Sequence, residues 1–431
     1  MTLHPKERPD GITRRDFLLR TAGAATVVSG AGSILAACAS ETTVESPTGT
    51  GGEAVGPLGL PLARPDKRIT IPFWEDPIAS GLEPETGGTF TVFNYPDYLY
   101  KKLLRDFGKK YGVDTDYTSF QNISSGIQRL ASGAVTPDVM EMTPDNLERA
   151  VAAKLIKPLN LDYIPNLQNN VWPGLASPFY DVDSHYTVPY TVYATGIFWR
   201  TDEIKEDIAS MPQPWDIFWQ AGDYKGKVGL LSEERETIGM ALLRKGILDI
   251  NTEDPKLIDQ GVADLKQLYD ICNIKVDDVQ YQAVPENRSW LHQAWSGDPI
   301  AAYIYYPLVP KGTPPTALGF WKADKGKVPI QNDCWSVCST TKKPVLSHLW
   351  LNYLLDNGIA YSNMVNFNGY QPPLNEISPE KLLADNIVPE HLTNAVLTND
   401  DLGSDSLQYG GLTARGQQLW QDGYSDFTAA G

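Results

Sequence analysis

The 431-residue sequence has little cysteine and histidine, no long apolar run in its body and a deficit of basic residues. Its 4 cysteines and 5 histidines are scattered and include no CxxC pair, so the common zinc-binding spacings are absent. Only 36 Lys and Arg residues stand against 53 Asp and Glu, for a net charge of −17. Because phosphate contacts require a basic surface, this balance argues against a nucleic-acid-binding protein.

Sequence signatures of common enzymes are also missing. The chain contains no GxSxG, GxGxxG, Walker loop or HExxH motif, and therefore no cofactor site and no metal site are expected. A carboxylate-dependent hydrolase stays open as an alternative, because a pair of carboxyl groups can act as acid and base without any such motif.

The first 37 residues have the order of an export signal. Two arginines, Arg14 and Arg15, precede Phe17 and two leucines, and this segment resembles a twin-arginine signal. A weakly apolar run follows that is too short and too rich in glycine to span a membrane. It ends in Leu-Ala-Ala-Cys, which resembles a lipobox with Cys38 as the lipidated residue. Removal of residues 1–37 leaves 31 basic and 50 acidic residues, a net charge of −19.

The rest of the chain predicts a tether followed by two α/β units. Residues 38–87 are rich in Gly, Pro and Ser and are expected to connect the lipid to the body. Because the later part contains Ile69, Ile71, Phe73 and Trp74, packing of this part on the body stays open. Apolar periodicity then predicts alternating strands and helices, which is typical of parallel sheets covered by helices. Expected strands are 89–94, 113–120, 138–143, 188–199, 227–231 and 300–305; expected helices are 98–111, 127–130, 146–155, 233–245 and 257–269.

Three cysteines remain in the body: Cys272, Cys334 and Cys338. The last two lie in an expected strand, where four residues span about 13 Å, too far for a direct disulfide. A bond between Cys272 and one of them, or three buried thiols, both stay open.

Two acidic segments are candidates for chemistry. The first, residues 231–236, begins an expected helix; Ser232 suits the N-cap, and acidic residues favour the positive end of the helix dipole. Three carboxylates there would repel an anion, so this helix start is not a phosphate site. The second, Asn94–Tyr98, joins an expected strand to an expected helix. Asp97 could cap that helix, or it could form part of an aromatic and acidic site for a cation.

Four segments give the chain a family resemblance. They are VFNYPDYL (92–99), residues 184–202, residues 215–246 and FNGYQPPLN (367–375). In order and spacing they resemble the spermidine/putrescine-binding proteins of bacterial ABC importers. This resemblance implies an α/β fold of two lobes, a type II periplasmic-binding-protein fold, in which each lobe is a mainly parallel sheet flanked by helices and the ligand cleft lies between the lobes.

The resemblance also implies lobe limits and ligand contacts. Lobe 1 would contain residues 88–193 and 333–378, and lobe 2 would contain residues 194–332 and 379–431. The residues that match the family's polyamine contacts are Tyr95, Asp97, Tyr98, Glu233, Glu236, Tyr305, Asp333 and Tyr370.

The expected function is therefore binding without catalysis. A monomeric lipoprotein on the outer face of the cytoplasmic membrane would capture a polyamine and deliver it to an ABC permease. The same fold with another organic cation or an amino-acid derivative as ligand is the second hypothesis, and the exported hydrolase is the third.

Overall fold

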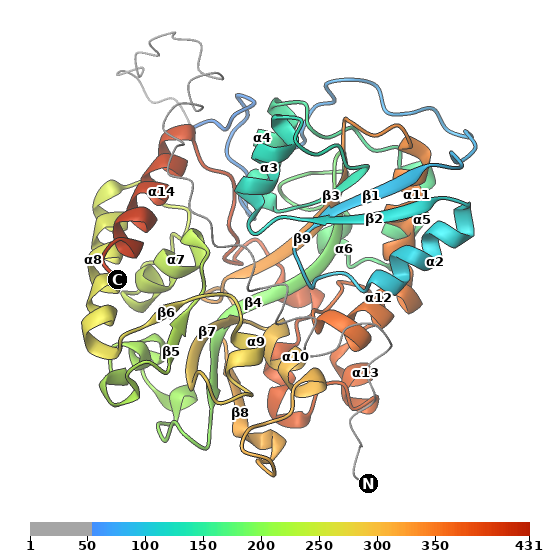
Figure 1. The fold of residues 1–431 in the computed structure, drawn as a ribbon. Coiled ribbons are helices and arrows are strands. Elements are labelled where there is room, and N and C mark those ends of the chain that lie inside the picture. Colours follow the sequence, from blue (N-terminus) through green and yellow to red (C-terminus); the bar gives the residue numbers. More distant parts are fainter. Residues whose placement is uncertain (1–53) are drawn as a thin grey trace, which may run out of the picture. The chain divides into compact units, whose positions relative to one another are not determined.

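A long strand, β4 (Val188–Arg200), joins the two halves of the sheet in a computed structural model that describes residues 54–431 (Figure 1). Its β-branched and aromatic residues favour an extended backbone. Twelve of its 13 residues are buried, because both faces of the strand are covered. Up to Ala194 it pairs with β9, and from Thr195 onward it pairs with β7.

The described residues form one nine-stranded sheet in the order β2-β1-β3-β9-β4-β7-β5-β6, with β8 paired to β4. The outer pairs are parallel, as expected for α/β units, whereas β9 and β4 run antiparallel to their neighbours. The strands are β1 (Thr89–Asn94), β2 (Asp114–Ser119), β3 (Val139–Met142), β4, β5 (Val228–Leu230), β6 (Lys275–Val276), β7 (Leu291–Trp295), β8 (Leu318–Trp321) and β9 (Ile330–Val337).

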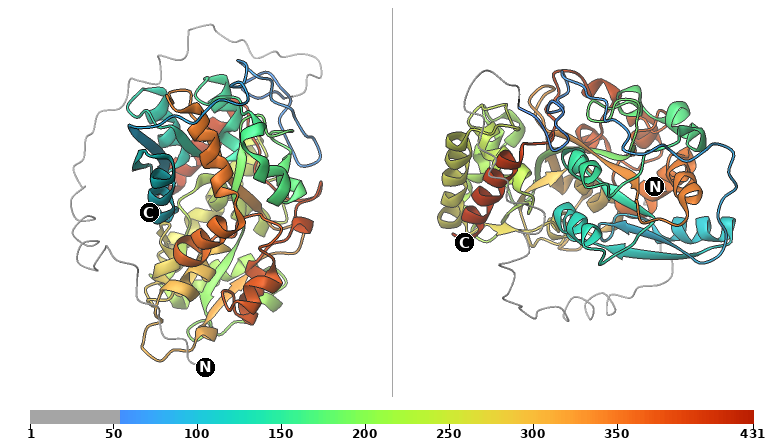
Figure 2. Two further views of the ribbon diagram at one scale, coloured as in Figure 1. Left: turned by 90° about the vertical axis from the view of Figure 1, so that its right-hand side faces the viewer. Right: turned by 90° about the horizontal axis from the view of Figure 1, so that it is seen from above.

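Helices cover the sheet on more than one side, as the two perpendicular views in Figure 2 show. Helices α7, α8 and α14 pack together over β5 to β7, with Ile238, Leu265 and Trp420 in their shared core (Figure 1). The α-helices are α2 (Lys101–Tyr111), α3 (Ile123–Ala131), α4 (Leu147–Ala152), α5 (Pro165–Asn170), α6 (Pro173–Ala176), α7 (Glu234–Arg244), α8 (Pro255–Cys272), α9 (Gln280–Ala283), α10 (Gly297–Tyr305), α11 (Pro344–Leu354), α12 (Asn357–Asn363), α13 (Pro379–Ala384) and α14 (Ala414–Thr428).

Most expected elements are present, but the strand expected at 300–305 is wrong. These residues belong to helix α10. A short apolar run has no periodicity that separates a buried strand from a buried helix. Here Pro299 in the first turn and the helix-forming Ala301 and Ala302 favour the helix.

A second correction concerns the start of α7. Its N-cap is Glu233, whose side chain makes no capping bond. Ser232, the expected N-cap, instead uses its hydroxyl and its backbone N–H to bond the Asp278 carboxylate. The three cysteines of the body are free thiols, and all three are buried.

The segment from Ala54 to Gly88 lies against the body. Ile69 and Ile71 are buried in a core shared with Phe93 and Met140. Earlier in the same segment, the Arg64 guanidinium donates to the Gly411 carbonyl, 3.0 Å away. The described part of the expected tether is therefore built into the fold.

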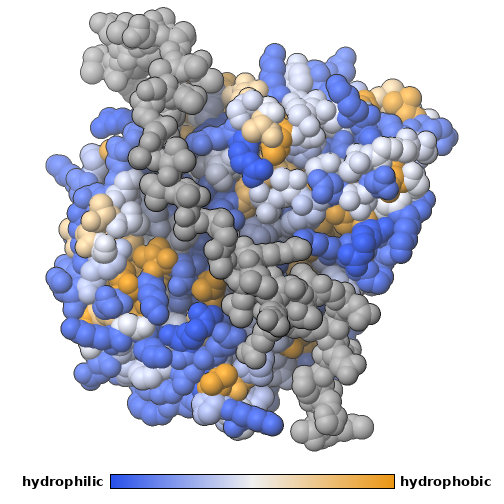
Figure 3. All heavy atoms as spheres, viewed as in Figure 1, coloured by the Kyte–Doolittle hydropathy of each residue, from blue (hydrophilic) through white to orange (hydrophobic). Residues whose placement is uncertain are grey.

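No helix within residues 54–431 has the length and apolarity needed to cross a bilayer. Where the described residues are visible in Figure 3, the surface is mostly hydrophilic, with separate apolar patches. Apolar side chains are instead gathered in the interior clusters around β1, β4 and α7.

The packing of residues 54–88 on the body can be tested at Glu85. Helix α11 begins at Pro344 without a side-chain cap of its own, and the Glu85 carboxylate accepts the N–H groups of Val345 and Leu346 at 3.1 and 2.9 Å. We expect Glu85→Ala to lower the free energy of unfolding by about 1 kcal/mol, the usual value of a lost N-terminal cap. Denaturant unfolding measures this, with the exposed Glu83→Ala as control. Equal losses in the two variants would contradict the capping role.

Candidate functional site

Strand β4 carries the hydrogen-bond donors of the first carboxylate. Thr191 and Tyr193 are two residues apart and so share one face of the sheet. Asp333 on the neighbouring β9 accepts from the Tyr193 hydroxyl at 3.0 Å and from the Thr191 hydroxyl at 3.3 Å. Tyr98, just before α2, donates a third bond to the same carboxylate. Asp333 is thus buried and bonded to three hydroxyl groups.

The next residue on that face of β4 serves a second carboxylate. Thr195 donates to Glu236, which lies in the first turn of α7, at 2.7 Å. The Trp295 indole N–H and the Tyr409 hydroxyl complete its shell at 3.0 and 3.3 Å. A carboxylate in a first helical turn also gains from the helix dipole.

A third buried carboxylate, Asp298, lies at the start of α10. It accepts from the Tyr370 hydroxyl at 2.9 Å, the Gln280 amide at 2.7 Å and the backbone N–H of Trp295 at 2.9 Å. Gly297 allows the Tyr370 ring to lie this close, because a Cβ on Gly297 would be 2.5 Å from that ring.

A fourth carboxylate, Glu141, comes from the middle of β3. It stands opposite Trp335 in the β3–β9 register, and Asp333 lies two residues from Trp335 on the same face. Glu141 is fully buried, and no N–H or O–H group of residues 54–431 donates to either of its oxygens. We call Glu141, Glu236, Asp298 and Asp333 the carboxylate cluster.

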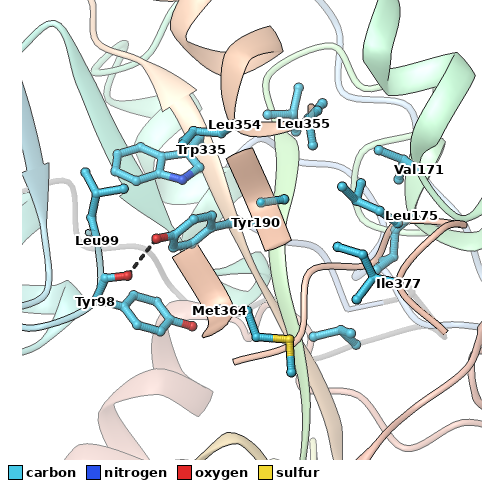
Figure 4. Packing of buried hydrophobic residues seen from close by; sticks show 14 of the residues in the cluster. Tyr98, Leu99, Val171, Leu175, Tyr190, Trp335, Leu354, Leu355, Met364 and Ile377 are labelled. Carbon is cyan, nitrogen blue, oxygen red and sulfur yellow. Dashed lines mark hydrogen bonds between the residues drawn. The ribbon is translucent and has the colours of Figure 1, made fainter. Parts of the chain in front are cut away.

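Aromatic rings surround this cluster. The Tyr98 ring makes edge contacts with Tyr190 and Tyr370, with ring centres 5.2 and 5.3 Å apart. Tyr193 packs between Tyr370 and Trp295 in the same manner. Figure 4 shows Tyr190 beside Tyr98, with its hydroxyl bonded to the Tyr98 carbonyl.

Burial raises the pKa values of the whole cluster. Loss of solvation raises the pKa of Asp333, Glu236 and Asp298 to about 6 each, against the opposing effect of their hydrogen-bond donors. The pKa of Glu141 is raised well above its ordinary value by burial and then by the charge of Asp333. Half-buried Glu233 also has a raised pKa, through burial and its neighbour Asp278.

One buried cation lies beside these acids. The Arg235 guanidinium favours the charged form of Glu236, but its N–H groups bond the Ile250 carbonyl and the Asn251 side chain, and it packs over the Tyr409 and Trp420 rings. Within residues 54–431, no group of three or more His, Cys, Asp and Glu side chains is arranged to hold a metal ion. The cluster therefore has an excess of buried negative charge whenever its carboxyls ionise.

The structure brings together some of the expected ligand residues. Tyr98, Glu236, Asp333 and Tyr370 are in or directly bonded to the carboxylate cluster. Tyr95 packs on Tyr98 with ring centres 6.2 Å apart. The roles of these residues as ligand contacts stay predictions.

Other expected residues lie elsewhere. Asp97 is exposed and has a left-handed backbone (φ 55°). Its charge contributes to raising the pKa values of Tyr117 and Tyr281. It does not cap α2, whose N-cap is Tyr100. The Tyr305 hydroxyl donates to the Met364 carbonyl at 2.6 Å, and no described contact joins it to the cluster. Cys38 lies outside the described residues.

Four members of the site were not expected from the sequence. The sequence pattern gives no sign of Trp295 and Asp298, because they precede the apolar run 300–305, which the pattern predicts as a strand. The pattern around Tyr193 predicts only a crossing strand. Glu141 has the clearest available signal, a single acid within the apolar strand VMEM, since a charged residue there must be buried.

The sheet, the crossing strand and the arrangement of helices define the two-lobed periplasmic-binding-protein class. Residues 102–389, more than half of the chain, match the model of the bacterial extracellular solute-binding protein family. The chain belongs to this family.

Named relatives are similar to the chain at modest identity. The spermidine/putrescine-binding periplasmic protein of Escherichia coli (strain K12) is 25% identical over 228 residues, which is 52% of this chain and 63% of the relative. The match thus spans less than two thirds of that protein.

Two solved structures share the fold. The substrate-binding protein PotD of a Streptococcus pneumoniae spermidine/putrescine ABC transporter has a TM-score of 0.59 and 19% identity, over 80% of this chain and 99% of that one. The TpPotD lipoprotein of Treponema pallidum has a TM-score of 0.62 and 17% identity, over 79% and 99%.

The pKa of Glu236 predicts a pH-dependent stability. Its pKa is raised from 4.5 to about 6 in the folded protein, so the folded state holds this proton more tightly than the unfolded state. The tighter binding of this proton stabilises the folded protein fully below about pH 4.5, and this stabilisation is lost as the pH rises through about 6. Denaturant unfolding between pH 4 and 8 measures this. As the pH rises, the free energy of unfolding of Glu236→Gln should increase relative to that of the wild type by about 2 kcal/mol, at about 1.4 kcal/mol per pKa unit. Parallel curves for the two proteins would contradict this assignment.

Proposed function

We propose that this solute-binding protein captures a polyamine of the putrescine or spermidine type and delivers it to an ABC permease. The carboxylate cluster, buried among tyrosine rings with an excess of negative charge, carries the proposal. The relative from Escherichia coli whose name states spermidine and putrescine binding supports the choice of ligand.

The electrostatics of the cluster favour a cationic ligand. Asp333 and Glu236 each accept three hydrogen bonds, which satisfy their oxygens but leave their charge uncompensated. A buried charge is costly unless an opposite charge accompanies it. The ammonium groups of a polyamine would supply that charge, and its methylene chain would pack on the rings of Tyr98, Tyr193 and Tyr370.

The predicted lobes give the ligand its mechanical role. Asp333 and Glu141 belong to predicted lobe 1, and Glu236 and Asp298 belong to predicted lobe 2. A ligand with a cationic group at each end would attract both pairs of carboxylates at once. It would stabilise the closed arrangement of the lobes by its differential affinity, and the permease would recognise that form.

Binding is favoured over hydrolysis for this site. The hydrolase hypothesis requires one carboxyl with a raised pKa beside an ionised partner. Here burial raises the pKa values of all four acids of the cluster, and Asp333, Glu236 and Asp298, with three donors each, share a pKa of about 6, while that of Glu141 is higher. The family to which the chain belongs is one of binding proteins.

Calorimetry and thermal shift with the full chain test the ligand. We expect putrescine or spermidine to raise the melting temperature, since a ligand that binds only the folded state stabilises it by mass action. Glu236→Gln should weaken binding more than about tenfold, because a hydrogen bond to a charged partner is worth about 1.5–3 kcal/mol. Glu234→Gln, on the same helix but bonded to Gln417, should retain affinity.

The panel includes spermine, agmatine, lysine and arginine. The absence of any shift with the polyamines would overturn the polyamine proposal. A shift with lysine or arginine alone would support the second hypothesis, an amino-acid derivative as ligand. Equal losses of affinity in Glu236→Gln and Glu234→Gln would contradict the assignment of Glu236 as a ligand contact.

We also propose that the protein is exported by the twin-arginine route, lipidated on Cys38 and held as a monomer on the outer face of the cytoplasmic membrane. The support is the order of Arg14, Arg15, the weakly apolar run and Cys38 in the sequence. A single lipid group binds membranes reversibly, and a diacylglyceryl group adds the second chain that stable anchoring requires.

Cys38→Ser tests the anchor. Detergent phase partitioning of cell extracts should move the protein from the detergent phase to the aqueous phase, because the lipid has no attachment site. Replacement of Arg14 and Arg15 by lysine should instead hold the uncleaved chain in the cytoplasm. A detergent-phase protein after Cys38→Ser would refute lipidation at this residue.

A further inference from the structure

Glu141 differs from the other acids of the carboxylate cluster because its one side-chain partner, Asp333, is another acid. Asp333, Glu236 and Asp298 each accept three hydrogen bonds, whereas Glu141 accepts none from an N–H or O–H group of residues 54–431. Its side chain is fully buried. An unsatisfied buried polar group costs about 1–3 kcal/mol, and more when it is charged, so a residue retained in this state points to a missing partner.

The surroundings of Glu141 show where that partner would lie. Its β3 position is opposite Trp335 and diagonal to Asp333, and the two carboxyl groups face each other. The charge of Glu141 also contributes to raising the pKa values of Tyr95 and Tyr193, which line the cluster. The side chain therefore points toward the same space as Asp333.

We propose that Glu141 and Asp333 together form a two-carboxylate seat for one primary ammonium group of the ligand. The inference rests on the proposed function in so far as the ligand is an organic cation. An ammonium group has three N–H donors and a full positive charge. It would give Glu141 the N–H donors that residues 54–431 do not supply, and it would neutralise the charge of one of the two acids.

The seat also predicts a proton balance. Two carboxyl groups in contact cannot both ionise easily, so the ligand-free pair retains one proton that belongs to both. The titratable groups around Glu141 are Asp333 on β9, Glu233 at the start of α7, Asp145 before α4 and the surrounding tyrosines, and the acids among them raise its pKa further. When the protonated amine enters, its N–H groups replace the shared O–H, and that proton is released to solvent.

Titration calorimetry in buffers of different ionisation enthalpy measures this proton. At pH 7, the wild type should release up to about one proton for each polyamine bound, since the pair shares one. Glu141→Gln keeps the shape of the side chain but removes the shared acid. It should release less proton than the wild type and lose about tenfold or more in affinity for putrescine and spermidine.

Glu148→Gln is the matched control. Glu148 is also a buried glutamate with a pKa raised by burial, to about 7, but it lies on α4 and faces residues 56–58. Its replacement should change neither the affinity nor the proton released on binding.

The outcomes separate this proposal from the function proposed above. If the wild type binds polyamines and Glu141→Gln binds them equally well with the same proton release, the seat is wrong and the function stands. If agmatine or a cationic amino acid binds instead, with the same dependence on Glu141, the seat stands and the polyamine is wrong. If no cation of the panel binds, both proposals fall.

If Glu141→Gln does not fold, one decisive measurement is still possible. The proton count needs only the wild type, and binding without proton release between pH 6 and 8 would overturn the shared proton. Asp333→Asn provides a second variant, because it removes the other half of the seat. It should also abolish the linked proton.

Discussion

The site depends on a change of partner along strand β4. The strand pairs with β9 up to Ala194 and with β7 from Thr195, and the residues on one of its faces, Thr191, Tyr193 and Thr195, bond Asp333 on one side of this change and Glu236 on the other. Because side chains alternate along a strand, one extended segment can hold both carboxylates in register. A shift of one residue would turn all three donors away from the acids.

Hydrogen bonds and charge play different parts in this arrangement. The hydroxyl groups of Tyr98, Tyr193 and Thr195 orient Asp333 and Glu236, and they lower the cost of burying a carboxylate without removing its charge. Burial therefore still raises both pKa values to about 6. Near neutral pH the ligand-free cluster is unfavourably charged, and a cation that enters recovers this free energy as affinity. Part of the stability of the empty protein is given up for binding.

The periodicity of the sequence predicted the elements that have a strong pattern of their own. Strand β4 and helices α2, α7 and α8 were expected within a few residues, because each is long or has a clear apolar stripe. Helix α10 was missed, since its short run is apolar all round and its conformation is decided by packing. This error also hid Trp295 and Asp298, which lie just before it and at its start. Asp97 was expected in the site by its position in a loop, whereas the left-handed turn at this residue directs it to solvent.

Glu141 shows why site residues on strands are hard to find from one sequence. In parallel sheets the loops that follow the strands hold the ligand groups, so a sequence points first to those loops. Glu141 comes instead from inside β3, and its neighbour Asp333 comes from a strand nearly 200 residues later in the chain. Their proximity follows from the antiparallel register of β3 and β9, which is a property of the sheet and not of either segment. An acid within an apolar strand is therefore a sign of a buried charge, but only the register tells which second acid shares it and thus what charge a ligand must bring.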